Sequence, residues 1–174
     1  MAPEQKIEIV QHLERGRQDF MDAVSGLDEA QAAHRPDPTR WSVLDCVEHV
    51  TSVEQRFLGW LEADKRVDAP SIDKEKEAAL LARVSDRSNR AQAPEAVLPT
   101  GRFATLAEAV EQFNAKRTLS IQFALDRCDD LYHLAAEHAR FGRLNGAEVM
   151  MLIVGHANRH AAQIREVRAT LEQS

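Results

Sequence analysis

The chain has 174 residues and a formal net charge of −6, with 44% hydrophobic and 29% charged residues. This length fits a single domain over residues 1–174, with enough apolar side chains to close one core. The composition excludes a typical nucleic-acid-binding protein, because its lysines and arginines are interspersed with acids rather than clustered. No run reaches the roughly 20 apolar residues that span a bilayer, and the start lacks a signal-peptide stretch, so we expect a cytoplasmic protein without membrane contact.

Apolar residues recur at helical spacing in four segments, while strand signals are nearly absent. Two of the segments open with capping patterns: Ser42 is followed by Asp45, and Thr105 is followed by Glu108. The fold class is therefore predicted to be all-α. The expected helices cover residues 9–24, ending near Gly26; residues 42–61; residues 105–128; and the C-terminal part after a loop at Gly142 to Gly146.

The connection over residues 62–104 is too long for a simple turn between bundle helices. Part of it, DKEKEAALLARVSDRSNR, favours a helix, and Pro94 and Pro99 then interrupt regular structure. A long middle connection lets the second and third helices run parallel. The sequence therefore predicts an up-down-down-up four-helix bundle.

Two histidines four residues apart, His156 and His160, lie on or beside the core-facing side of the last helix. Buried imidazoles need partners, and a divalent metal ion supplies one partner to both. Partly exposed histidines bonded to water are the alternative for such a pair. His49 borders the apolar side of the second helix and is a candidate third ligand, since facing helices of a bundle build metal sites in this manner.

Two known metal motifs are excluded by neighbouring residues. A zincin helix needs a glutamate directly after the first histidine, but Ala157 follows His156. A ferritin-like di-iron site needs a glutamate three residues before a ligating histidine, and Cys46, Ile153 and Ala157 occupy those places. Three histidines without a carboxylate ligand leave coordination positions open, as catalytic metals require.

The combination of RWSVLDCVEHV on the second helix and GHANRHAAQI on the last resembles the DinB-like superfamily, the DinB/YfiT group of bacterial four-helix-bundle proteins. The likeness extends over essentially the whole chain. It implies that His49, His156 and His160 bind a divalent metal ion and that the protein is a homodimer. Members of this superfamily include bacillithiol S-transferases, mycothiol-dependent maleylpyruvate isomerase and proteins described as metal hydrolases.

Several other residues are candidates for the site, each with a structural alternative. Gln163 shares the face of His156 and His160 and could orient a bound ligand, or bond to backbone at the core edge. Arg117 lies on an apolar stripe, where it could bind a substrate carboxylate or thiol cofactor, or form an internal ion pair. Asp45 and Glu48 could accept a hydrogen bond from the His49 imidazole, or be solvated charges on the outer face.

The two cysteines, Cys46 and Cys128, lie far apart inside apolar segments. Their placement favours reduced thiols in the core over a disulfide. Cys46 lies one turn before His49, so an approach to the metal is the alternative to a small buried hydrophobe.

The leading functional hypothesis is an enzyme acting on a small-molecule substrate with a divalent ion, Zn²⁺, Ni²⁺, Fe²⁺ or Mn²⁺, at the three histidines. By family resemblance we prefer a thiol-dependent S-transferase with a low-molecular-weight thiol cosubstrate. No residue near the histidines reads clearly as a general base. A metal-dependent hydrolase is the alternative, and a non-catalytic protein that binds a metal or small ligand is the second alternative.

Overall fold

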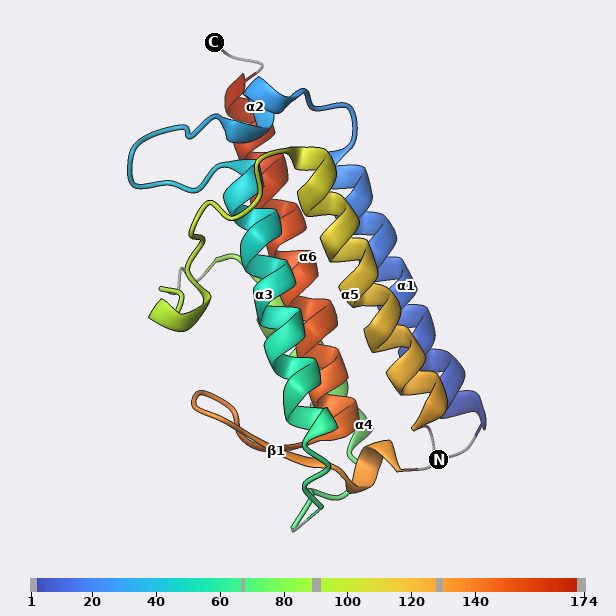
Figure 1. Cartoon of the computed structure of the whole chain (residues 1–174). Helices are drawn as coiled ribbons and strands as arrows, with labels where there is room; N and C mark the ends of the chain where they lie inside the picture. Colours follow the sequence, from blue (N-terminus) through green and yellow to red (C-terminus); the bar gives the residue numbers. More distant parts are fainter. Residues whose placement is uncertain (1–2, 67, 89–91, 128–129, 172–174) are drawn as a thin grey trace.

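Four long helices form the bundle in the computed structural model (Figure 1). The first and last helices run in one direction and the two middle helices run in the other, which confirms the predicted up-down-down-up order. The helices are α1 (Pro3–Val24), α3 (Val43–Glu62), α5 (Leu106–Asp126) and α6 (Gly146–Leu171). The structure describes residues 3–66, 68–88, 92–127 and 130–171, so the predicted core position of Cys128 lies outside the described residues.

Polar side chains cap three of these helices at the residues that precede them. Ser42 accepts from the backbone N–H of Asp45, and Asp45 accepts from that of Ser42, which completes the predicted capping box of α3. Thr105 caps α5 through the N–H of Glu108. Asn145 and Glu148 make a reciprocal pair of the same kind before α6. Each cap satisfies backbone donors that a helix start leaves without partners.

The long connection contains α4 (Lys74–Ser85) and the 3₁₀ turn η1 (Glu95–Val97). The shorter connections also contain elements: α2 (Glu29–Ala33) precedes α3, and between α5 and α6 lie the 3₁₀ turn η2 (Leu131–His133) and an antiparallel hairpin of β1 (Ala135–His138) and β2 (Gly142–Asn145). The hairpin corrects the expected loop at Gly142 to Gly146. Its strands contain no β-branched or aromatic residue, so the sequence carried no strand signal there.

The helix α4 packs closely against α6 at Gly155, the residue before His156. A Cβ atom added to Gly155 would lie 2.9 Å from Cβ of Val84 and 3.1 Å from the carbonyl oxygen of Leu81. Only glycine leaves room for this approach, so the connection after α3 is seated directly beside the predicted metal ligands. None of the described helices combines the length and apolar content that crossing a bilayer requires.

A polar layer divides the interior of the bundle into two apolar clusters. On α5, Phe113 belongs to one cluster and Ile121 to the other, and Arg117 lies between them with no exposed surface. The guanidinium donates to both oxygens of Glu54 at 2.8 and 3.0 Å and to the carbonyl of Leu13 at 2.8 Å. The internal ion pair, one of the two interpretations that the sequence left open for Arg117, is thus the arrangement in the structure.

The variant Glu54→Ala should lower the free energy of unfolding by about 3 to 5 kcal/mol, because it leaves the buried Arg117 cation without its partner. Urea unfolding followed by circular dichroism measures the change. The double variant Glu54→Leu, Arg117→Met removes both charges and should recover most of the loss. A single variant as stable as the parent protein would contradict this role of the ion pair.

Candidate metal centre

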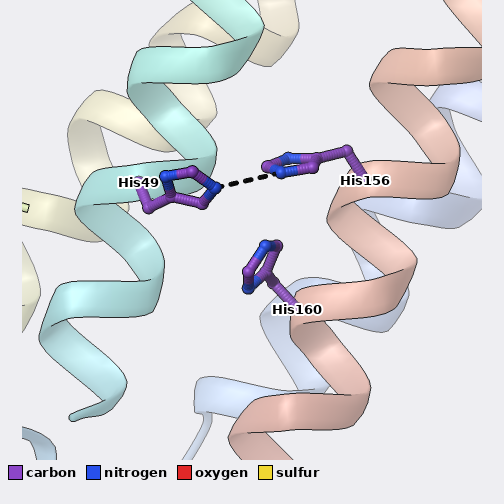
Figure 2. Close-up of side chains that lie close together, drawn as sticks. All are labelled: His49, His156 and His160. Atoms are coloured by element: carbon purple, nitrogen blue, oxygen red, sulfur yellow. Dashed lines mark hydrogen bonds between the residues drawn. The ribbon is translucent and has the colours of Figure 1, made fainter. Parts of the chain in front are cut away.

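The three predicted histidines meet between α3 and α6 (Figure 2). His49 comes from the second turn of α3, and His156 and His160 come from successive turns of α6. One ring nitrogen from each residue lies within 4.8 Å of the other two, and no second group of this kind occurs among the described residues. His49 and His160 are 4% and 5% exposed, and His156 is partly exposed, so solvent reaches the cluster at His156.

A backbone carbonyl fixes the orientation of the His49 ring. Its Nδ1 lies 2.7 Å from the carbonyl oxygen of Val97, in η1 of the long connection. Because a carbonyl oxygen only accepts, Nδ1 carries the proton and Nε2 turns its lone pair toward the other two rings. Metal-binding histidines commonly make a hydrogen bond of this type through their second nitrogen.

The spacing of the nitrogens fits one shared ion. His49 Nε2 and His156 Nε2 are 3.1 Å apart. Two nitrogens bound to one tetrahedral zinc ion would be about 3.3 to 3.4 Å apart, given their usual bond lengths. His160 contributes a third ring nitrogen within the same 4.8 Å, and its Nδ1 has no hydrogen-bond partner in the described part of the chain. Three imidazoles with nitrogens this close together form a donor set that accommodates a divalent ion.

The imidazoles are held in their neutral, metal-binding form. Burial lowers the pKa of His49, and the hydrogen bond to Val97 only partly opposes this. Burial also lowers the pKa values of His156 and His160 well below the usual range, and neighbouring imidazoles and arginines add to the shift. Neutral imidazole is the form that binds metal ions, so no proton has to leave before an ion enters.

Trp41 covers the cluster from the start of α3. Its ring centroid is 4.8 Å from that of His49 and 5.9 Å from that of His160, in the latter case nearly parallel. Trp41 was not among the site candidates predicted from the sequence. Trp41 directly precedes the capping residue Ser42, and Ser42 lies seven residues before His49. This spacing is the signal that could have placed Trp41 near the site.

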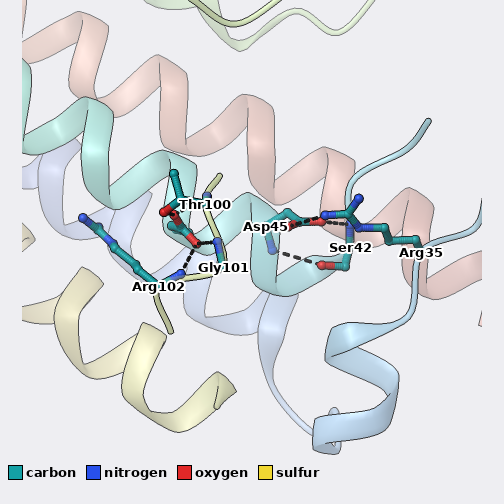
Figure 3. A network of polar contacts seen from close by, with 7 residues as sticks. Arg35, Ser42, Asp45, Thr100, Gly101 and Arg102 are labelled. Carbon is teal, nitrogen blue, oxygen red and sulfur yellow. Dashed lines mark hydrogen bonds and ion pairs between the residues drawn. The ribbon is translucent and has the colours of Figure 1, made fainter. Parts of the chain in front are cut away.

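Glu48 anchors the loop that follows Val97, through Thr100, Gly101 and Arg102, which are labelled in Figure 3. Its buried carboxylate accepts four hydrogen bonds of 2.7 to 3.1 Å, from the backbone N–H and hydroxyl of Thr100 and from the backbone N–H groups of Gly101 and Arg102. Asp45 caps α3 and pairs with Arg35. Asp45 and Glu48 are therefore not solvated charges on the outer face. They do not accept from His49 either, because its Nδ1 donates to the Val97 carbonyl. Glu48 affects that imidazole only through the loop it holds.

The remaining candidates lie outside the imidazole cluster. Gln163 accepts a hydrogen bond of 2.9 Å from Arg87, and its role toward a ligand stays a prediction. Cys46 is fully buried in an apolar cluster, as expected of a small hydrophobe. Burial and the charge of Asp45 raise the pKa of its thiol, which keeps it protonated. Arg117 belongs to the separate polar layer with Glu54.

The metal-free protein should lose stability as the pH falls below the usual histidine pKa of about 6.5. Because the pKa values of the folded cluster are lowered, the unfolded chain binds protons that the folded protein does not bind. Each such proton lowers the free energy of unfolding by roughly 1.4 kcal/mol for every pH unit. Above about pH 6.5 the imidazoles are neutral in both the folded and the unfolded state, so the free energy of unfolding is not reduced by this proton uptake. Denaturant unfolding at a series of pH values measures the slope, and His160→Asn should flatten it. Equal slopes for the two proteins would refute this origin.

Replacing Glu48 by glutamine should weaken metal binding by roughly tenfold, in the range found for residues that support ligands. Both oxygens of the Glu48 carboxylate accept hydrogen bonds from the loop, but a glutamine amide has only one oxygen that can accept. The loop and the Val97 carbonyl therefore lose their fixed position. Competition with a chromophoric chelator measures the affinity, and the visible spectrum of bound Co²⁺ reports the ligand geometry. Glu95→Gln, an exposed charge change in η1, is the matched control; an equal effect of both variants would contradict the role of Glu48.

Comparison with known proteins places this chain in a family. Residues 12–164 match the model of the DinB superfamily. YuaE of Bacillus subtilis (strain 168), described as uncharacterized, is 21% identical over 151 residues, which are 87% of this chain and 91% of that protein. The structure of YfiT from Bacillus subtilis is similar over 100% of this chain and 91% of that chain, with a TM-score of 0.65 and 16% identity, a likeness of fold. The chain belongs to the DinB superfamily.

Proposed function

We propose that this protein is a divalent-metal-dependent enzyme whose ion is held by His49, His156 and His160. The observation that carries the proposal is the convergence of three imidazole nitrogens within 4.8 Å, in a cluster to which no carboxylate contributes. Three protein ligands leave at least one coordination position open to a small molecule, which is the arrangement of a catalytic site rather than a structural one. YfiT supports the proposal, since it is described as a probable metal-dependent hydrolase.

The chain itself supplies orientation and exclusion of water. The Val97 carbonyl holds His49 in one tautomer, and Trp41 shields His49 and His160. His156 is the partly exposed ligand, so a substrate approaches from its side. A bound divalent ion would supply Lewis acidity that lowers the pKa of a coordinated thiol or water.

Between the two reaction types, we favour transfer of a low-molecular-weight thiol to an electrophile. Among the described residues, the group of possible ligands consists of the three histidines alone, and no carboxylate belongs to it. The site therefore offers no evident general base, and a thiol, whose pKa is about 8.5, needs less help to ionise than water does. Hydrolysis is the second candidate because of the description of YfiT.

Imidazole ligands suit several first-row ions, so Zn²⁺, Ni²⁺, Fe²⁺ and Mn²⁺ all remain candidates. Tag-free protein analysed by elemental mass spectrometry identifies the ion and its amount. The predicted homodimer is part of this proposal and is tested by light scattering on the same preparation.

Removal of the ion by a chelator should abolish turnover of a thiol with an electrophilic substrate, and His160→Ala should lower both turnover and metal content by roughly a hundredfold. The reason is that two remaining imidazoles hold a divalent ion far less tightly than three. His34→Ala, an exposed histidine in a loop, is the matched control. Ester hydrolysis without thiol transfer would favour the second candidate. Stoichiometric metal without either reaction would identify a non-catalytic binding protein.

A further inference from the structure

A row of aromatic rings connects the second half of α3 with the turn of the hairpin. The centroid of the Trp60 ring lies 5.9 Å from that of His138, and the centroid of the His138 ring lies 4.8 Å from that of Phe141. Phe57 is buried beneath this row, 4.8 Å from Trp60 and 5.9 Å from His138. The rings of Trp60, His138 and Phe141 are partly exposed, so the row combines an anchored base with a surface that a ligand can reach.

Three exposed arginines from three different elements lie over these rings. The Cζ atoms of Arg83 on α4 and Arg140 in the hairpin turn are 5.3 and 5.7 Å from the centre of the Phe141 ring. The Cζ atom of Arg56 on α3 is 5.7 Å from the centre of the Trp60 ring. Attraction between a cation and an aromatic face holds each guanidinium in place without an acid. The three rings and the three arginines are called the hairpin patch below.

No acid neutralises the arginines of the hairpin patch in the part of the chain that the structure describes. The side chains of Arg56, Arg83 and Arg140 make no ion pair or hydrogen bond there, whereas Arg143 of the same hairpin pairs with Glu137. Two positive charges over one phenylalanine ring repel each other. Because the chain as a whole has a net charge of −6, this repulsion is a local feature that an anion from outside would relieve.

The hairpin turn holds the patch in shape and adds a neutral donor. His138 Nδ1 accepts from the backbone N–H groups of Arg140 and Phe141, at 3.0 and 3.3 Å. Because Nδ1 accepts, the hydrogen of the neutral ring is on Nε2, which can only donate. The same two bonds fix the backbone that carries Arg140 and Phe141. A site whose groups are already in position loses less entropy when a ligand binds.

We propose that the hairpin patch binds a small organic anion with at least two negative charges and an apolar body. The number of charges follows from the arginines, which lie over two separate rings, and the apolar body follows from the partly exposed Trp60 and Phe141. Carboxylates and phosphates both match the paired N–H groups of a guanidinium. The patch is separate from the metal centre, since Trp60 follows His49 by three helical turns, roughly 16 Å along α3.

The two tryptophans of the chain allow a direct test, because Trp60 lies in the hairpin patch and Trp41 lies at the candidate metal centre. Isophthalate, a benzene ring with two carboxylates, is titrated into isotope-labelled protein at constant ionic strength. It should move the indole N–H resonance of Trp60 and leave that of Trp41 in place. Neutral benzamide should bind at least about tenfold more weakly, because it cannot pair with the guanidiniums. Phenyl phosphate, compared with isophthalate, identifies which oxyanion the patch prefers.

Arg83→Gln and Arg140→Gln should each weaken isophthalate binding by roughly five- to tenfold, the loss of one charge-assisted contact. Arg15→Gln removes the same charge from an exposed position on α1 and is the matched control, with an affinity within about twofold of the parent value. Equal affinities in these three variants, or benzamide binding as tight as that of isophthalate, would overturn the proposal. A shift of the Trp41 resonance in place of Trp60 would overturn it as well, since the anion would then bind at the other site.

Discussion

The hydrogen bond between His49 Nδ1 and the carbonyl of Val97 is the interaction on which the candidate site depends. It joins the first half of the bundle to the long connection, and it determines which nitrogen of His49 faces the other imidazoles. Glu48, the neighbour of His49 on α3, holds the loop that provides this carbonyl. One turn of helix thus supplies a candidate metal ligand and also fixes the backbone group that orients it.

The interior contains two sets of buried polar groups, and they are completed in different ways. Arg117 and Glu54 satisfy each other, with Ser120 and a carbonyl of α1 taking up remaining hydrogen bonds. The imidazole cluster leaves His160 Nδ1 without a partner among the described residues. Buried polar groups that satisfy each other, such as Arg117 and Glu54, help to specify the fold. Buried polar groups that lack a partner, such as those of the imidazole cluster, mark a place where an external ligand is expected.

The helices, their caps and the three histidines could be predicted because each has a local signal. Apolar periodicity located the helices, serine or threonine three residues before an acid located two starts, and helical spacing placed His156 and His160 on one face. The hairpin was missed because its strands lack residues typical of strands. Val97 acts through its backbone, and Glu48 acts across 52 positions of sequence, so neither role leaves a local pattern.

The absence of a side chain at Gly155 links the packing of α4 to the residue next to His156, a candidate metal ligand. Substitutions on the α4 surface that meets Gly155, at Val84 for example, would alter the distance between the two helices while every imidazole stays unchanged. Substitutions in α4 alone can therefore change the packing beside the histidine cluster. In this architecture, ligand preference can evolve separately from the ability to retain an ion.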